Sequence, residues 1–168
     1  MGLRNRHQYE EHFSFFVTTT CYNWMPFIQQ SNTFSIIENT LQFVSEKFHT
    51  KILAYVIMPN HIHLILHFTK TNHLSAFMRD FKKFTSVEIK KRLNKNISPK
   101  IWMDRFDDVY IRDKSHLEVK LAYIHHNPLQ EKWNLSSTPE KYLFSSASYY
   151  YLGEHSSQLK TTHYLDIF

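Results

Sequence analysis

Glycine is almost missing from this sequence, with only Gly2 and Gly153 among 168 residues. Phosphate-binding loops of the Walker and Rossmann types need several closely spaced glycines, because the backbone must approach the phosphates. The Gly-x-Ser-x-Gly turn that carries the nucleophile of many acyl-transfer enzymes is missing for the same reason. The scarcity of glycine therefore excludes these kinds of nucleotide site and this kind of hydrolase.

Cysteine and long apolar runs are also scarce. Cys21 is the only cysteine, so one chain can form neither a disulfide nor a cysteine-rich zinc site, which suits a reducing cytoplasm. No apolar run approaches the roughly 20 residues needed to cross a bilayer, and residues 1–11 lack the apolar core of a signal peptide. We expect a soluble, cytoplasmic protein without a membrane partner.

The sequence does contain enough apolar residues for a core and an uneven distribution of positive charge. Hydrophobic residues make up 42% of the 168 residues, which predicts one folded domain over residues 1–168. The net charge is +5, and residues 74–95 alone carry seven basic side chains against two acidic ones. Such a concentration indicates a polyanionic partner, although a solvated helix face would look the same. The candidates for binding such a polyanion, and thus for DNA binding if the polyanion is DNA, are Arg79, Lys82, Lys83 and Lys90.

The order of the predicted elements indicates the fold class. Strands are predicted over residues 12–20, 52–58, 61–68 and 109–111, and helices over residues 33–48, 74–93 and 116–127. Residues 22–30 are expected to form a loop. This β-α-β-β-α-β order, followed by another helix, is typical of a ferredoxin-like α+β fold with an antiparallel sheet and helices packed on one face. The core covers about residues 12–128, with a C-terminal extension over residues 129–168.

Two histidines on the third predicted strand are the most informative feature. Alternate residues of a strand point to the same face, so His61 and His63 would present two imidazoles about 6–7 Å apart. Ile62, Leu64 and Leu66 would then point into a core on the opposite face. Two imidazoles at this spacing can bind one divalent ion, although a pair of surface histidines is the more frequent case. His67 lies too far along the strand to share the ion.

The late helix supplies a second set of polar groups. Tyr123 and Asn127 are four residues apart and therefore lie on the same side of a helix. An asparagine oxygen is a suitable ligand for Mg²⁺ or Mn²⁺, so His61, His63 and Asn127 could form one site. Asn127 also precedes a proline, where it could act only as a helix cap. Tyr110 is a competing nucleophile, but it lacks an asparagine partner.

Several motifs resemble the single-tyrosine HUH transposases, above all the REP-associated tyrosine transposases and related insertion-sequence enzymes. They are Pro59-Asn60-His61-Ile62-His63-Leu64, Tyr123-Ile124-His125-His126-Asn127-Pro128, the stretch from Trp102 to Asp113, and Pro139 to Ser146. The resemblance covers most of the chain. Phe144 stands where many relatives have tryptophan, and the first strand lacks an arginine that several relatives carry.

The resemblance implies the HUH nuclease fold and a chemistry. His61, His63 and Asn127 would hold Mg²⁺ or Mn²⁺, and Tyr123 would attack single-stranded DNA next to a hairpin. The product would be a 5′-phosphotyrosine that is later rejoined. It also implies a homodimer, in which the tyrosine helix could act within its own chain or in the partner.

Three other functions stay open at this stage. The chain could be a domesticated protein that binds DNA hairpins without cleaving them. It could be an HUH replication initiator or relaxase, although those proteins are generally longer. A metal-dependent hydrolase of small phosphates is a further possibility, which would not need the basic helix.

Overall fold

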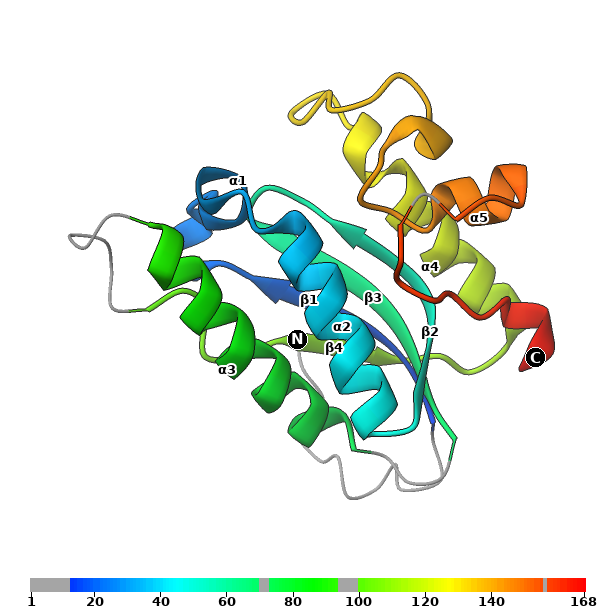
Figure 1. The fold of residues 1–168 in the computed structure, drawn as a ribbon. Coiled ribbons are helices and arrows are strands. Elements are labelled where there is room, and N and C mark those ends of the chain that lie inside the picture. Colours follow the sequence, from blue (N-terminus) through cyan, green and yellow to red (C-terminus); the bar gives the residue numbers. More distant parts are fainter. Residues whose placement is uncertain (1–12, 70–72, 94–99, 156) are drawn as a thin grey trace.

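A four-stranded antiparallel sheet forms the centre of the computed structural model, which describes residues 13–69, 73–93, 100–155 and 157–168. The strands are β1 (Ser14–Thr20), β2 (Thr50–Ile57), β3 (His61–Phe68) and β4 (Asp107–Tyr110), in the spatial order β2-β3-β1-β4 (Figure 1). β2 and β3 pair as a hairpin across the turn at Pro59 and Asn60. This hairpin confirms the prediction made from the turn-prone Pro-Asn pair.

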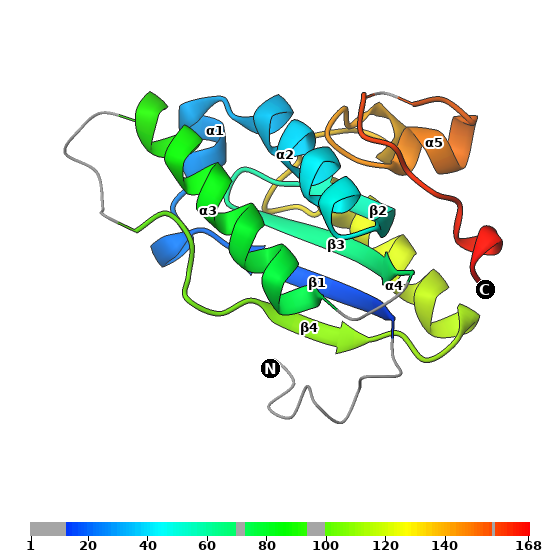
Figure 2. The ribbon, with the colours of Figure 1, turned by 60° about the horizontal axis from the view of Figure 1, so that its bottom comes forward.

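Two long helices cover one face of the sheet. These are α2 (Phe34–Lys47) and α3 (Leu74–Arg92), which lie across the same side in Figure 2. Ile62, Leu64 and Leu66 are fully buried beneath them, as the alternation in β3 predicts. This larger of the two cores also contains Phe77 and Phe81 from α3.

The third long helix, α4 (Lys114–His126), packs on the opposite face of the sheet (Figure 2). The helix begins where the Asp113 carboxylate accepts a hydrogen bond of 2.8 Å from the backbone N–H of His116. Its buried Leu117 and Ile124 belong to a second apolar cluster with Phe16 of β1 and Ile65 of β3. The expectation that helices pack on one face only was therefore wrong in this detail, because the alternating strands are apolar on both sides.

The C-terminal extension covers the outer edge of β2. The backbone N–H of Ile57 donates to the Phe144 carbonyl at 2.9 Å, and that of Ser146 donates to the Tyr55 carbonyl at 3.0 Å. The Tyr142 hydroxyl donates to the Ile57 carbonyl at 2.8 Å. These bonds occupy backbone groups that would otherwise form an unpaired sheet edge. The motif from Pro139 to Ser146 therefore has a structural role.

The remaining elements are short. They are the helices α1 (Phe27–Ser31) and α5 (Ala147–Leu152) and single 3₁₀ turns at Tyr22–Trp24, Asn127–Leu129, Pro139–Lys141 and Tyr164–Asp166. α1 lies in the region expected to be a loop. The predicted start of the first strand at residue 12 and the basic Lys95 lie outside the described residues. Among the helices that the structure describes, none is long and apolar enough to span a membrane.

Candidate active site

His61 and His63 project from β3 towards α4, and their ring centroids are 4.8 Å apart. Both side chains are buried, with exposed fractions of 6% for His61 and 4% for His63. The structure therefore brings the two imidazoles together on one face, as the strand alternation predicts. Each ring is held by a polar neighbour that fixes its orientation.

Asn60 orients His61. Its side-chain amide donates to the Trp24 carbonyl at 2.9 Å, which determines which end of the amide is oxygen. The Asn60 Oδ1 is 2.7 Å from Nδ1 of His61, and this oxygen can only accept. The proton of the neutral imidazole therefore lies on Nδ1, and Nε2 keeps its lone pair.

Thr18 plays the same part for His63. Its Oγ1 is 2.8 Å from Nδ1 of His63, in the directly opposite register position on β1. Neighbours of this kind, which hold the second nitrogen of a histidine, are usual around metal-binding imidazoles. Sequence reasoning missed Thr18, although the alternation in the first strand puts it on the same face.

Both imidazoles are neutral near pH 7. Burial lowers the pKa of His61 to about 4, while Asn127 opposes this shift and Lys132 adds to it. Burial, the neighbouring His61 and nearby lysines lower the pKa of His63 to about 3. Neutral imidazoles have the lone pairs that a metal ion needs.

Tyr123 on α4 and Asn127, the residue that caps the C-terminal end of α4, reach the same place. The Tyr123 ring centroid is 5.2 Å from that of His63 and 5.9 Å from that of Phe16, and the side chain is 46% exposed. Asn127 is 2% exposed, and its Oδ1 lies beside the His61 ring without a well-aligned hydrogen bond to any described residue. One chain therefore brings together all four side chains predicted for the site.

The donor set at this place fits a divalent ion. It consists of two neutral imidazoles and one buried amide oxygen without a partner, a combination that suits Mg²⁺ or Mn²⁺ with further positions for water or phosphate. A buried carbonyl oxygen without a donor is unfavourable unless something binds it. The described residues contain no cluster of three or more His, Cys, Asp or Glu side chains that could form another metal site.

Two lysines lie on either side of the histidine pair, and sequence reasoning missed both. The Lys120 ammonium lies 4.9 Å from the centroid of the Phe16 ring, which stacks on His63 with centroids 5.4 Å apart. Lys132 lies 5.7 Å from the ring of Trp133, itself 5.6 Å from the His61 ring. The position of Lys120 three residues before Tyr123, on the same side of a helix, was an available signal.

Other side chains considered from the sequence lie elsewhere. Tyr110 contacts Phe15 on the opposite face of the sheet, with ring centroids 6.3 Å apart. His125 is buried, and its Nε2 is 3.0 Å from the Ser146 hydroxyl, so it joins α4 to the C-terminal extension. Trp24 is 62% exposed, so it lies outside the core.

The four predicted DNA-binding residues lie on α3, across the sheet from the histidines. Arg79, Lys83 and Lys90 are exposed, as predicted. Lys82 is half-buried, because its ammonium donates to main-chain carbonyls of residues 103–105. Lys82 is therefore less accessible than the other three candidates.

Residues 10–127 match the family model described as "Transposase IS200 like". The chain belongs to the IS200-like transposase family. No curated protein matches the sequence. Membership of the IS200-like family confirms the resemblance to insertion-sequence transposases that the sequence motifs indicate.

Two solved structures are similar to this member of the IS200-like family. A REP-associated tyrosine transposase bound to a REP hairpin superposes with a TM-score of 0.66 at 20% identity, over 80% of this chain and 76% of that one. A putative transposase from Deinococcus radiodurans R1 matches at 11% identity with a TM-score of 0.48, over 67% of this chain and 88% of that one. The first of these similarities confirms the predicted α+β fold of the HUH type.

Proposed function

We propose that the protein cleaves and rejoins single-stranded DNA beside a hairpin, with Tyr123 as the nucleophile and a divalent ion at His61, His63 and Asn127. The observation that carries this proposal is the convergence of one exposed phenol with two neutral imidazoles and an unpartnered amide oxygen. Family membership supports DNA as the substrate. The hairpin bound to the structurally similar transposase supports the form of that DNA.

The proposed reaction is a transesterification. The Tyr123 hydroxyl oxygen forms a bond to a backbone phosphorus, and the bond from that phosphorus to the 3′ oxygen breaks. The phenol loses one proton and the leaving 3′ oxygen takes up one, so no proton is gained or lost overall. The products are a 5′-phosphotyrosine and a free 3′-hydroxyl, and reversal of the same step rejoins a strand.

Each side chain has a distinct part in this proposal. The exposure of Tyr123 lets a strand of DNA reach the phenol, while burial and Asn60 and Thr18 hold the imidazoles in one orientation. A bound divalent ion would polarise the phosphate and stabilise the charge that develops on it. The positive charge of Lys120 would favour the same developing charge.

We also propose that the tyrosine acts within its own chain, because one chain supplies all four groups. A homodimer is part of the proposal, but the geometry of the site does not require a second subunit. Mg²⁺ and Mn²⁺ fit the donor set equally well.

The test is incubation of the protein with labelled single-stranded hairpin oligonucleotides and Mg²⁺ or Mn²⁺. We expect a covalent protein–DNA adduct that Tyr123→Phe abolishes and that a chelator prevents. Tyr110→Phe is the matched control, because that phenol lies on the other face of the sheet, and it should leave the adduct unchanged. An adduct that survives in Tyr123→Phe would assign the nucleophile elsewhere, and hairpin binding without any adduct would indicate a binding protein without chemistry.

A further inference from the structure

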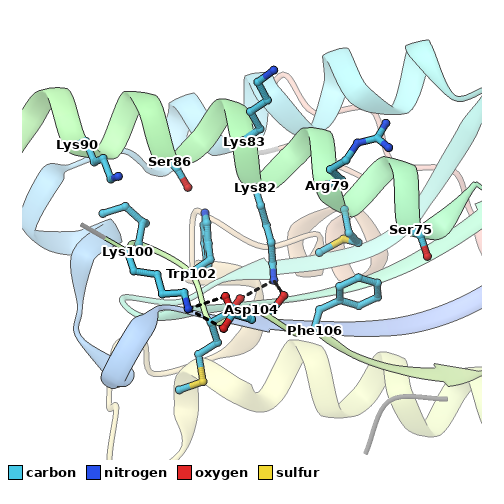
Figure 3. A pocket seen from close by; sticks show the side chains of 13 residues that line it. Ser75, Arg79, Lys82, Lys83, Ser86, Lys90, Lys100, Trp102, Asp104 and Phe106 are labelled. Atoms are coloured by element: carbon cyan, nitrogen blue, oxygen red, sulfur yellow. Dashed lines mark hydrogen bonds and ion pairs between the residues drawn. The ribbon is translucent and has the colours of Figure 1, made fainter. Parts of the chain in front are cut away.

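A second concave site lies between α3 and the segment of residues 100–106, away from the histidine pair (Figure 3). The cavity has a volume of about 470 Å³, within the range in which proteins bind small organic groups. Five of its lining side chains are basic and one, Asp104, is acidic. Neither the proposed metal site nor the proposed nucleophile uses this cavity.

Lys82 holds the two walls of the cavity together. From α3 its ammonium donates to the carbonyls of Met103 at 2.8 Å, Arg105 at 3.3 Å and Asp104 at 3.5 Å. Burial lowers the pKa of Lys82 to about 8, and the carboxylate of Asp104 opposes this shift. A half-buried ammonium with three carbonyl partners fixes the segment against the helix, so the cavity is formed before any ligand binds.

The same segment is joined to the strand next to the candidate active site. The backbone N–H of Met103 donates to the Thr20 carbonyl at 2.9 Å, and Thr20 is the register partner of His61. Trp102 also forms an isolated bridge with Cys21. The cavity and the histidine pair therefore lie at the same end of the sheet, on its two sides.

The walls combine cations with an apolar floor. Lys90 from α3 and Lys100 from the opposite wall lie at one end of the cavity (Figure 3). Lys90 has no ion pair among the residues that the structure describes, whereas Lys100 lies 2.6 Å from the Asp104 carboxylate. Phe106 is partly exposed at the cavity, Met78 and Trp102 line its apolar floor but are themselves almost fully buried, and Ser86 adds a hydroxyl on the α3 side.

This combination suits a ligand with a flat apolar body and a phosphate. Exposed cations are sufficient to bind the phosphates of a DNA backbone. A cavity of this size with apolar walls can in addition bind a base that is not stacked on its neighbours. We propose that the cavity binds one unpaired nucleotide of the DNA, with its phosphate at Lys90 and Lys100. The proposal rests on the proposed function for the choice of DNA as the ligand, and it adds a second point at which the strand is held.

Disulfide crosslinking tests this placement directly. Ser86→Cys puts a thiol in the cavity, and Ser35→Cys, on the exposed side of α2, is the matched control. The native Cys21 is buried, and burial raises the pKa of its thiol to about 12, so it should not react. With hairpin oligonucleotides that carry a thiol-tethered base at successive single-stranded positions, Ser86→Cys should crosslink strongly at one or two neighbouring positions. Equal crosslinking at all positions, or equal crosslinking by Ser35→Cys, would overturn the proposal.

Binding measurements provide a second test that needs no engineered thiol. Removal of the base at the position found by crosslinking should weaken binding about 5- to 100-fold. Lys90→Gln should weaken DNA binding and reduce its salt dependence by about one phosphate contact. The matched change is Lys91→Gln, because Lys91 lies outside the cavity and is paired with Glu88. Both effects should be smaller in Lys91→Gln than in Lys90→Gln. An abasic penalty at no position would refute the base pocket.

These measurements use Tyr123→Phe without added metal, so the chemistry cannot influence them. Position-specific crosslinking without adduct formation by the wild-type protein would refute only the proposed reaction. Adduct formation without position-specific crosslinking would refute only the pocket. Free mononucleotides at millimolar concentration should compete poorly, because they lack the rest of the strand, and efficient competition would identify a free nucleotide as the ligand instead.

Discussion

Two adjacent threonines of β1 offer a sharp test of how the candidate site is held. Thr18 points to the histidine face, where its hydroxyl is 2.8 Å from Nδ1 of His63. Thr19 points to the opposite core, where it is 1% exposed and its hydroxyl has no hydrogen-bond partner among the described residues. The same substitution, threonine to valine, should therefore have opposite effects at the two positions.

The expected magnitudes follow from burial and hydrogen bonding. In Thr18→Val the buried imidazole nitrogen of His63 loses its hydrogen-bond partner, which lowers the free energy of unfolding by about 1–3 kcal/mol. The added methyl group raises the free energy of unfolding by at most about 0.8 kcal/mol. In Thr19→Val a buried hydroxyl without a partner is replaced by a methyl group, which should stabilise the protein by about 1 kcal/mol. The two variants should thus differ by about 2 kcal/mol in the free energy of unfolding.

Urea denaturation measures this difference, and the rate of adduct formation measures its effect on function. Thr18→Val should slow the reaction about 10- to 100-fold, as loss of a neighbour that orients a metal-binding histidine does elsewhere, whereas Thr19→Val should not. Thr18→Ser keeps the hydroxyl and should recover most of the activity. Equal stability of the two valine variants, or a fully active Thr18→Val, would refute the orientation argument.

Three further changes test other parts of the molecule. Lys120→Gln should slow adduct formation about tenfold, because a nearby ammonium stabilises developing negative charge by about 1–2 kcal/mol. Lys120→Arg keeps the positive charge and should retain the rate. Lys114→Gln is the control, because Lys114 lies on the same helix but is paired with Glu118, and it should leave the rate unchanged. Asn127→Ala should raise the metal concentration that gives half-maximal activity about tenfold or more. Calorimetric titration of Mn²⁺ checks the loss of metal affinity independently. Unchanged metal binding would show that Asn127 serves only as a helix cap. Burial raises the pKa of Glu38 above its ordinary value of 4.5, so the native state binds this proton more tightly than the unfolded chain and loses stability as the pH rises above 4.5. Glu38→Gln should remove that loss, and its advantage in urea denaturation should grow from pH 4 to pH 7; a constant difference would contradict the assignment.

Local periodicity explains why so much of the fold was predictable. The strand over residues 61–68 has the predicted bounds, and α3 and α4 end within about two residues of prediction. The alternation of a strand is a property of its backbone, so it determines that His61 and His63 share a face whatever packs against them. The four-residue spacing of Tyr123 and Asn127 has the same local character.

Side-chain environments were less predictable, because they depend on segments distant in sequence. Lys82 belongs to a helix face that looks solvated, but the 100–106 segment lies beside it and supplies carbonyl partners. Phe84 follows Phe77 and Phe81 at the spacing of one apolar helix face, and yet it is 40% exposed, since nothing among the described residues covers that part of α3 fully. Periodicity predicts which side of a helix is apolar, but not how far a neighbouring element extends over it.

The sequence by itself therefore determined the pair of imidazoles, the phenol and amide one helical turn apart, and the order of strands and helices, because each depends on backbone geometry over a few residues. Only the tertiary structure decided that α4 crosses the histidine face. That placement depends on Leu117 and Ile124 packing against Phe16 and Ile65, and burial of apolar surface is non-directional. A local pattern can show that a helix has an apolar face, but the complete set of competing surfaces decides where that face is buried.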